Sequence, residues 1–361
     1  MATITWKCPN CGGGLIFDPK TQNYKCEYCL SNFTLEELEQ TEEGKRAEQG
    51  NQEREEQRQK GRSLEEQRTE GEALVYTCPS CGAQIVTDET TAATFCYYCH
   101  NPVVLEGRLD GSYRPDYVVP FAIDRKQAEE IFGQWIGRKR YVPSDFYSKK
   151  QIESMTGVYF PYWLYSCRVE GELDAEGTKL RMWDAGNLRY TERKIYHVSR
   201  QGQMPVNHVS RNALKKANSR LSEGVLPFQM EGLKPFQMGY LAGFQAEKRD
   251  MERQELTAEV EQEVREFALS SLQSSADGYS SLNVQKQRAE IQDAQWHYGL
   301  FPVWTLTYKG PKDGKIYYFA LNGQTGKVCG EVPVDRRKLS VLFLSVFLPL
   351  LTLLLVLGYF I

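Results

Sequence analysis

The pattern of apolar and polar positions divides the chain into a polar N-terminal third and a longer, aromatic and apolar body. From about residue 110 onward, apolar runs predict strands at 116–123, 157–169 and 187–199, and wider apolar spacings predict helices near 125–139 and 208–222. This mixture of strands and helices predicts an α+β body.

A longer helix is predicted near 248–273. Its apolar positions follow a spacing of three to four residues, at Leu256, Val260, Val264 and Phe267. Such a stripe forms one face of an amphipathic helix. We expect this face to pack on the domain's own sheet; a groove for a partner helix is the alternative.

Two further patterns lie within the body. Phe-Pro-Tyr-Trp at 160–163 resembles Phe-Pro-Val-Trp at 301–304, which suggests two related α+β halves. Residues 315–321 and 327–332 predict a hairpin, because the loop at 322–326 contains residues that tolerate positive φ. The loop lacks the Gly-x4-Gly-Lys-Ser/Thr spacing of a phosphate loop, so we interpret it as a turn.

Residues 339–361 carry no charge. As a helix they would extend roughly 34 Å, against a hydrocarbon core of about 30 Å, so one transmembrane helix is predicted. Pro349 is tolerated in such a helix, whereas a buried core helix, the alternative, would need apolar surroundings on every face. The preceding Arg336, Arg337 and Lys338 favour a single-pass protein of the cell membrane, in contact with lipid, whose soluble portion is cytoplasmic.

Eight of the ten cysteines form four Cys-x-x-Cys pairs, and fourteen residues separate the pairs within each copy of the repeat. The two copies are Cys8, Cys11, Cys26 and Cys29, and Cys78, Cys81, Cys96 and Cys99. Four thiolates complete the shell of a structural Zn2+, so two zinc ribbons with one structural zinc ion each are predicted. A redox Cys-x-x-Cys, the alternative, would occur singly in a thioredoxin-like context.

Size and compartment support metal binding at these cysteines. A ribbon of about 30 residues is too small to fold on its core alone, so metal would supply most of its folding free energy. The start of the chain lacks the basic and apolar regions of a secretory signal, which favours a reducing compartment over disulfides.

His100 is not expected to be a ligand, because four thiolates already close the site. Cys167 and Cys329 are expected to be buried small apolar residues.

Residues 34–72, between the ribbons, contain no aromatic residue and are mainly Glu, Gln and Arg. Such a composition cannot bury a core, so a solvated, partly helical spacer is predicted. The predicted organisation is a first ribbon at 1–33, a charged spacer at 34–74, a second ribbon at 75–107, the α+β body at 108–335 and the transmembrane helix at 339–361.

Charge and motif content argue against nucleic-acid binding and catalysis. The formal net charge is −3, and no Lys or Arg occurs between Arg68 and Arg108, across the second ribbon. Nucleic-acid affinity depends largely on such cations. The sequence lacks His-Glu-x-x-His, Gly-x-Ser-x-Gly and a glycine-rich phosphate loop, so neither an enzyme nor a small-molecule substrate is predicted.

Several segments together resemble a known family across nearly the whole chain. They are the two Cys-Pro-x-Cys-Gly ribbons, Val-Pro-Phe at 119–121, the aromatic stretch at 159–163, Tyr-Leu-Ala-Gly-Phe at 240–244 and Asn-Gly-Gln-Thr-Gly-Lys at 322–327. In this order, before a terminal span, they resemble bacterial TFIIB-type zinc-ribbon membrane proteins of the YdjG-like kind. The resemblance implies association with phage-shock-type envelope-stress systems, with PspA-like and SPFH-domain proteins as partners.

These observations predict a non-enzymatic, zinc-binding, tail-anchored membrane scaffold that docks protein partners at the cytoplasmic face, and the resemblance implies a role in the envelope-stress response. The alternative is a membrane-tethered nucleic-acid-binding or transcription- or replication-related zinc-ribbon protein. The lack of basic residues in the second ribbon weighs against that alternative. A third hypothesis, a hydrolase within the body, would require a deep polar pocket.

Overall fold

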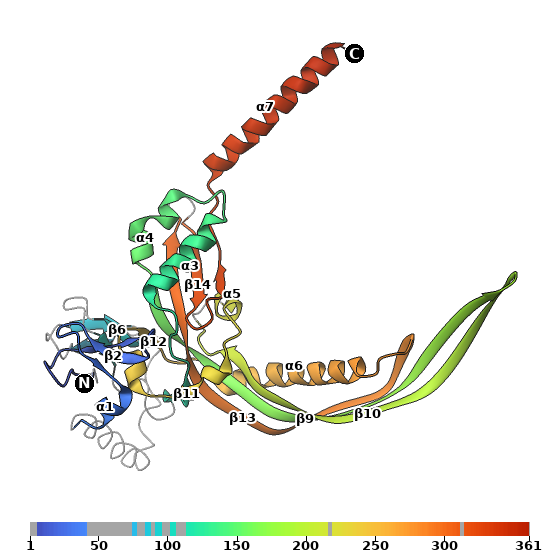
Figure 1. Cartoon of the computed structure of the whole chain (residues 1–361), viewed down its shortest axis with the longest axis horizontal. Coiled ribbons are helices and arrows are strands. Elements are labelled where there is room, and N and C mark those ends of the chain that lie inside the picture. Colours follow the sequence, from blue (N-terminus) through green and yellow to red (C-terminus); the bar gives the residue numbers. More distant parts are fainter. Residues whose placement is uncertain are drawn as a thin grey trace. The chain divides into compact units, whose positions relative to one another are not determined.

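The computed structural model describes residues 6–41, 113–215, 219–310 and 314–360, together with strand segments at 74–77, 84–87, 91–95 and 102–105. The chain forms two compact units (Figure 1). Unit 1 comprises Met1–Pro161, Leu214–Lys248 and Leu300–Ile361, and unit 2 comprises Tyr162–Ala213 and Arg249–Gly299. Both units contain helices and strands, which confirms the predicted α+β class of the body.

Unit 2 is built on long antiparallel strands that carry one helix. Its elements are β9 (Thr156–Ala185), β10 (Leu188–Asn212), α6 (Arg253–Ser274) and β13 (Ser281–Lys309), of which β9 and β13 continue into unit 1. β9 and β10 form a hairpin whose register runs from Ala185↔Leu188 to Tyr162↔Asn212. β9 lies between β10 and β13, and α6 runs along the strands (Figure 1).

The apolar stripe of α6 packs on its own sheet, as predicted. Val260, Val264 and Ala268 form one buried cluster with Tyr165, Cys167 and Val169 of β9. Phe267, which was predicted to belong to the stripe, is 62% exposed. The buried positions advance by four residues from Leu256 onward, and that ridge reaches Ala268 rather than its neighbour.

Two predicted elements differ in the structure. The helix predicted near 208–222 is wrong at its start, because residues 208–212 belong to β10 and 209–212 pair with β9; the helix found there is α5 (Ser219–Gly224). The strand predicted at 116–123 is shortened to β8 (Tyr117–Val118). In both places, pairing with distant strands decides the backbone conformation that local pattern leaves open.

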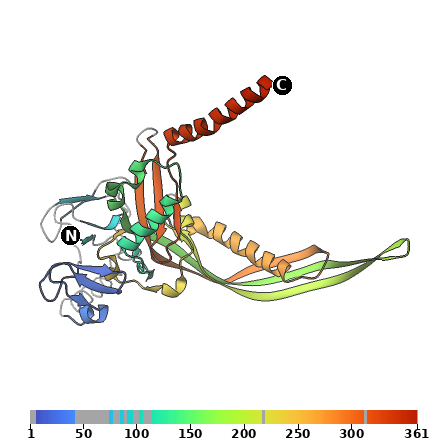
Figure 2. The same cartoon turned by 45° about the horizontal axis from the view of Figure 1, so that its top comes forward.

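Unit 1 contains a sheet that includes the C-terminal part of β13, with α3 (Arg125–Gly137) packed on it. Other strands of this unit are β11 (Lys234–Pro235), β12 (Gln245–Glu247), β14 (Ile316–Asn322) and β15 (Val328–Gly330). α3, which confirms the helix predicted near 125–139, crosses the face of β13 and β14 (Figure 2). The ring of Phe132 lies edge-on to Phe319, 4.8 Å away. The predicted β14–β15 hairpin is confirmed, with Gly326 at a φ of 77°.

The last helix, α7 (Arg336–Phe360), is exposed along its length. Its stretch Arg336–Gly358 is long and apolar enough to span a membrane. The helix starts on the body: Lys338 Nζ donates to Val142 O at 2.7 Å, and Asp335 N donates to Tyr141 O at 2.7 Å. The apolar helix therefore follows the folded body without an intervening linker.

β9 changes its partner at a proline. On one edge it pairs with β12 at Val158 and Tyr159, and from Tyr162 onward it pairs with β10. Pro161 lies between the two ladders. Proline has no backbone N–H to donate, so it is tolerated where one ladder ends and another begins.

The same change occurs in β13. Val119 N donates to Leu300 O at 3.0 Å, next to β8, and the ladder with β14 begins at Val303. Pro302 lies between them, and its carbonyl accepts from Gly323 N at 2.8 Å. The proline of each Phe-Pro-x-Trp segment thus marks the point where a long strand passes from one set of partners to another.

The tryptophan of each Phe-Pro-x-Trp segment binds the start of a helix. Trp163 Nε1 donates to Met251 O and Trp304 Nε1 to Ile123 O, both at 2.9 Å. Each acceptor lies two residues before the first residue of its helix, α6 or α3. Trp163, from the first predicted half, therefore binds α6 of the second half, and both lie in unit 2. Trp304, from the second half, binds α3 of the first half, and both lie in unit 1.

We predict that Trp304→Phe and Trp163→Phe each lower the free energy of unfolding by about 1–3 kcal/mol, because each leaves a carbonyl at a helix start without its donor. Thermal and urea unfolding of the detergent-solubilised chain would measure the loss. Trp183→Phe is the matched control: that side chain is 44% exposed, and we expect a change within about 0.5 kcal/mol. Equal effects of all three substitutions would contradict the assigned role.

Candidate metal centre

The first cysteine set lies in a small β module within unit 1. Its elements are β1 (Leu15–Asp18), β2 (Asn23–Cys26), β3 (Asn32–Phe33) and α1 (Leu35–Glu39). The β1–β2 turn is held by Asp18, whose carboxylate accepts from Lys20 N and Thr21 Oγ1, each at 3.0 Å. The buried apolar side chains of the module are few: Leu15, Phe17, Tyr24 and Leu38. A core of this size gives little stability by itself.

The two Cys-x-x-Cys pairs of this module form the same backbone turn. In the first, Cys8 N donates to Gly13 O at 2.7 Å and Gly12 N to Cys8 O at 2.8 Å. The second pair repeats both hydrogen bonds at Cys26, Ser31 and Leu30. Gly12 and Leu30 occupy equivalent positions with left-handed φ values of 73° and 60°. Glycine adopts this conformation freely, whereas for leucine it costs about 1 kcal/mol.

The four sulfur atoms of the module converge. Cys8 Sγ lies 3.4 Å from Cys29 Sγ, Cys11 Sγ lies 3.5 Å from Cys26 Sγ, and all four lie within 4.8 Å of one another. Zn–S bonds of about 2.3 Å in a tetrahedron separate the sulfurs by about 3.8 Å. The first predicted ligand set therefore forms a cluster of the size that a four-coordinate metal requires.

The thiols of the cluster differ in acidity. Burial raises the pKa of the Cys8 thiol. Hydrogen bonding with the side chain and then the backbone of Ser31 lowers the pKa of the Cys29 thiol to about 6. Cys29 is therefore mostly a thiolate at neutral pH, and a metal ion that binds all four sulfurs must displace protons from others. Metal affinity should consequently fall as the pH falls.

The second ligand set, Cys78, Cys81, Cys96 and Cys99, lies outside the described residues, as does His100. Strands on either side of these positions are described. β4 (Leu74–Thr77) pairs with β5 (Gln84–Thr87) so that Thr77 lies opposite Gln84. The equivalent residues of the first module, seventy positions earlier, are Lys7 and Gly14, and they form a bridge of the same antiparallel kind.

A second pair of strands repeats the register of the first module. β6 (Thr91–Phe95) pairs with β7 (Pro102–Val104) through Thr94↔Val103 and Phe95↔Pro102. In the first module, β2 pairs with β3 through Tyr24↔Phe33 and Lys25↔Asn32, again seventy positions earlier. The repeat seen in the sequence is therefore also a repeat of strand register.

The first module packs on the body at the segment 240–244. The Phe17 ring lies 5.3 Å from Tyr240, and Phe17 N donates to Ala242 O at 2.9 Å. In the β1–β2 turn itself, Lys20 Nζ lies 2.6 Å from the Asp124 carboxylate. No periodicity or spacing in the sequence predicts this contact. The packing leaves the opposite end of the module exposed, with Tyr28 70% and Leu30 68% accessible.

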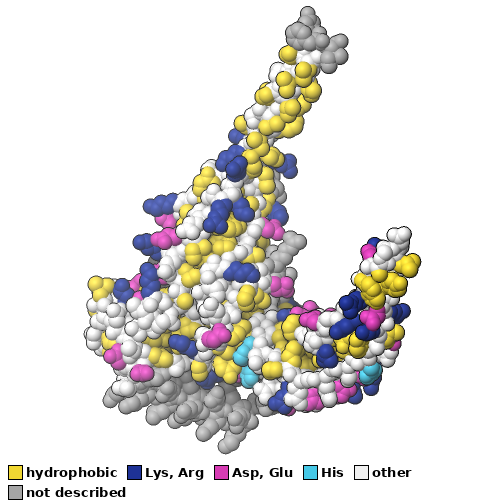
Figure 3. All heavy atoms as spheres, turned by 45° about the vertical axis from the view of Figure 1, so that its right-hand side comes forward, with side chains coloured by type: hydrophobic (Ala, Val, Ile, Leu, Met, Phe, Trp, Pro, Cys, Tyr) yellow, Lys and Arg dark blue, Asp and Glu magenta, His cyan; other side chains and the backbone are white. Residues whose placement is uncertain are grey.

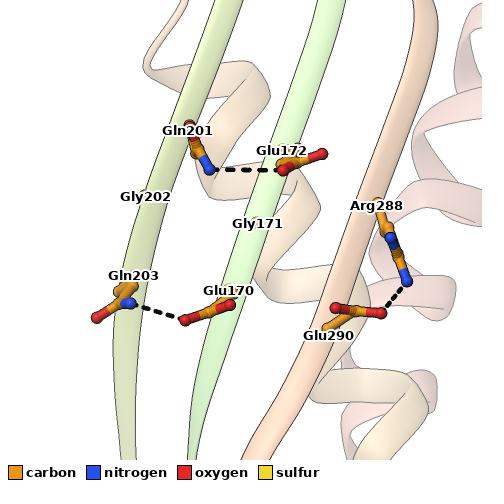
Figure 4. Close-up of a pocket in the computed structure, with 8 residues that line it drawn as sticks. All are labelled: Glu170, Gly171, Glu172, Gln201, Gly202, Gln203, Arg288 and Glu290. Atoms are coloured by element: carbon orange, nitrogen blue, oxygen red, sulfur yellow. Dashed lines mark hydrogen bonds and ion pairs between the residues drawn. The ribbon is translucent and has the colours of Figure 1, made fainter.

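Unit 2 contains a polar hollow of about 350 Å³ on neighbouring strands (Figure 4). It is lined by Glu170, Gly171, Glu172, Gln201, Gly202, Gln203, Arg288 and Glu290. Gln203 donates to Glu170, Gln201 donates to Glu172, and Arg288 pairs with Glu290. Each of these carboxylates already binds a neighbouring side chain, so the hollow is a network within the sheet surface. Within the described ranges, only the first cysteine set brings together three or more His, Cys, Asp or Glu side chains that could hold a metal.

The two cysteines outside the repeat play no part in the cluster. Cys167 is buried on β9 against α6, as predicted, and Cys329 on β15 is half-buried.

Comparison with known proteins finds one extended relationship. The chain is 31% identical over 340 residues to YdjG of Bacillus subtilis (strain 168), described as an uncharacterized protein, and the match covers 94% of this chain and 93% of that protein. No protein-family model matches the chain. No solved structure matches it.

Proposed function

We propose that this chain, which belongs to the family of the Bacillus subtilis protein YdjG, is a non-enzymatic, zinc-binding membrane scaffold that docks protein partners at the cytoplasmic face. The observation that carries the proposal is the closed set of four sulfurs, in a module that packs on an α+β body followed by an exposed apolar helix. Four thiolates leave no coordination position open for a substrate, so the metal would have a structural role.

Zinc fits the sulfur cluster best among the common metals. A tetrahedral set of four sulfurs favours zinc or iron, and a closed structural site with paired knuckles is typical of zinc. The second site is proposed on the repeated register, because identical strand pairing seventy residues later would bring Cys78, Cys81, Cys96 and Cys99 into the same arrangement. We therefore propose two zinc ions per chain.

The membrane role is assigned to α7. Arg336, Arg337 and Lys338 precede an uncharged stretch, and basic residues beside a span are retained in the cytoplasm and attract anionic lipid. Lys338 also binds the body through Val142 O, so the face of unit 1 near Val142 would lie at the lipid headgroups. The body would then be cytoplasmic.

The exposed end of the first module is the surface that we assign to protein partners. Tyr28 and Leu30 are exposed on the turn of the second Cys-x-x-Cys pair, Cys26 and Cys29, and a rigid metal-bound turn would hold them in place. The resemblance to YdjG-like zinc-ribbon membrane proteins implies association with envelope-stress systems, and so suggests PspA-like or SPFH-domain partners. A nucleic-acid role, the second candidate, would need cations at this end, and the nearby zinc-bound thiolates would add negative charge instead.

We predict two zinc ions per chain in protein purified in mild detergent. Cys26→Ser and Cys96→Ser should each remove one equivalent, because each breaks one closed set of ligands. Elemental mass spectrometry for zinc and iron would measure both. Cys329→Ser is the control and should leave the metal content unchanged. Iron in place of zinc, or zinc in one site only, would contradict the assignment.

We predict that the body faces the cytoplasm and that α7 is its membrane anchor. Lys149→Cys places a thiol at a side chain that is 92% exposed; it should resist a membrane-impermeant reagent in intact cells and react after permeabilisation. The unsubstituted chain is the labelling control. Deletion of 339–361 should release a soluble protein that retains its zinc. Labelling of this thiol in intact cells would show that the body faces the outside of the cell.

The scaffold role predicts direct binding of the reconstituted chain to a purified PspA-like or SPFH-domain protein. Tyr28→Ser with Leu30→Ser should weaken binding at least about tenfold while zinc content stays the same, since a few residues buried at the centre of an interface, tyrosine often among them, carry most of its binding energy. Asn23→Ser, elsewhere on the module, is the control. Binding to double-stranded DNA that falls with salt, without binding to either protein, would favour the nucleic-acid candidate.

A further inference from the structure

The rest of unit 2 packs on only part of the β9–β10 hairpin, and the end of the hairpin extends beyond it. Up to Thr178, alternate side chains of β9 are buried, and Leu173 and Ala175 cluster with Val198 and Ala276. Ser280 marks the end of this cover: its backbone N–H donates to Thr178 O and its hydroxyl accepts from Leu180 N. Residues 179–196, which we term the arm tip, continue past the end of α6 as a two-stranded ribbon (Figures 1 and 2).

The arm tip is rich in exposed apolar side chains. They are Leu180, Met182, Trp183, Leu188, Tyr190, Ile195 and Tyr196, with exposed fractions of 39–66%. Figure 3 shows hydrophobic and cationic side chains close together near the end of the arm. Monomeric proteins seldom expose so many large apolar side chains in one place without a binding role.

Both faces of the ribbon carry apolar groups. Residues opposite each other in an antiparallel pair share a face, so Trp183 lies with Tyr190, and their rings stack 5.6 Å apart. Leu180 and Met182 alternate with Trp183 along β9 and therefore lie on the other face. A protein groove normally covers one face of a strand pair. An environment that contacts both faces, and that offers both apolar and polar groups, matches the ribbon better.

The charge of the arm tip is positive. Its cations are Lys179, Arg181, Arg189, Arg193 and Lys194, and its anions are Asp184 and Glu192, which leaves a net charge of +3. Arg181 lies 5.7 Å from the Trp183 ring, and Lys179 lies 5.5 Å from the Tyr196 ring. Tryptophan, tyrosine and basic residues together are typical of the boundary between lipid headgroups and acyl chains.

We propose that the arm tip is a membrane contact separate from α7, which binds the headgroup layer of an anionic bilayer. The net charge of +3 complements anionic headgroups, and the apolar side chains on both faces reach the upper acyl region. The ribbon from Lys179 to Ala185 is roughly 20 Å long, comparable with the interfacial layer. Its outer edges carry backbone N–H and C=O groups that hydrocarbon cannot satisfy, so the tip lies at the interface and does not span the bilayer.

The test uses the full chain reconstituted in vesicles with an environment-sensitive fluorescent amino acid in place of Leu188. Brominated lipids, which quench the probe on contact, are placed either in the host vesicles or in vesicles added afterwards, so that contact with the same or a second bilayer is detected. The matched control carries the probe in place of Gln201, which is also exposed but lies on β10 outside the arm tip. Circular dichroism and zinc content verify the fold of each variant.

We expect lipid quenching of the probe at 188 but not at 201, in vesicles that contain phosphatidylglycerol. Arg181→Gln, Arg193→Gln and Lys194→Gln should each weaken the contact about fivefold, because each removes one cation from an anionic surface. High salt should weaken it as well. Quenching that is equally strong in vesicles without anionic lipid would overturn the proposal. So would the absence of quenching with brominated lipid in the host vesicles and in the added vesicles. So would energy transfer between probes on two chains without lipid contact, which would identify the tip as an interface between copies.

Discussion

Both units depend on β9 and β13, two long strands that each change pairing partners at a proline. Pro161 and Pro302 cannot donate to a ladder, and each lies where one set of strand partners ends and the next begins. Trp163 and Trp304 follow two residues later and bind the starts of α6 and α3. One short motif thus ends a ladder and positions a helix, and its occurrence in both strands places α6 in unit 2 and α3 in unit 1.

The first cysteine module shows how a very small core can be positioned firmly. Its own apolar groups are few, so two other sources of order act on it: the convergence of four sulfurs at one end and the contact of Phe17 with Tyr240 at the other. A metal would order the knuckles, while the body orders the β1–β2 turn. This division leaves the end with Tyr28 and Leu30 accessible, which is the reason for assigning partners to that end.

Apolar surface is exposed in two very different settings. In α7 it covers a whole helix, whose backbone hydrogen bonds are internal, so the segment suits the hydrocarbon core. In the arm tip it is interleaved with Arg181, Arg193 and other cations on a ribbon with open edges, which suits the bilayer surface. Backbone hydrogen bonding, more than apolar content, distinguishes a segment that spans from one that lies at the interface.

The sequence by itself determined the features that are encoded within a few neighbouring residues. The cysteine spacing predicted the convergence of Cys8, Cys11, Cys26 and Cys29; the apolar spacing of three to four residues predicted the buried face of α6 as far as Val264; and the uncharged stretch predicted α7. Only the tertiary structure decided what depends on distant partners. Residues 208–212 are a strand because Asn212 pairs with Tyr162, fifty residues away, and the arm tip is bare because its cover ends at Ser280. Local periodicity and turn geometry act within a few residues, whereas strand pairing and exposure are set by whichever remote segments reach the same place.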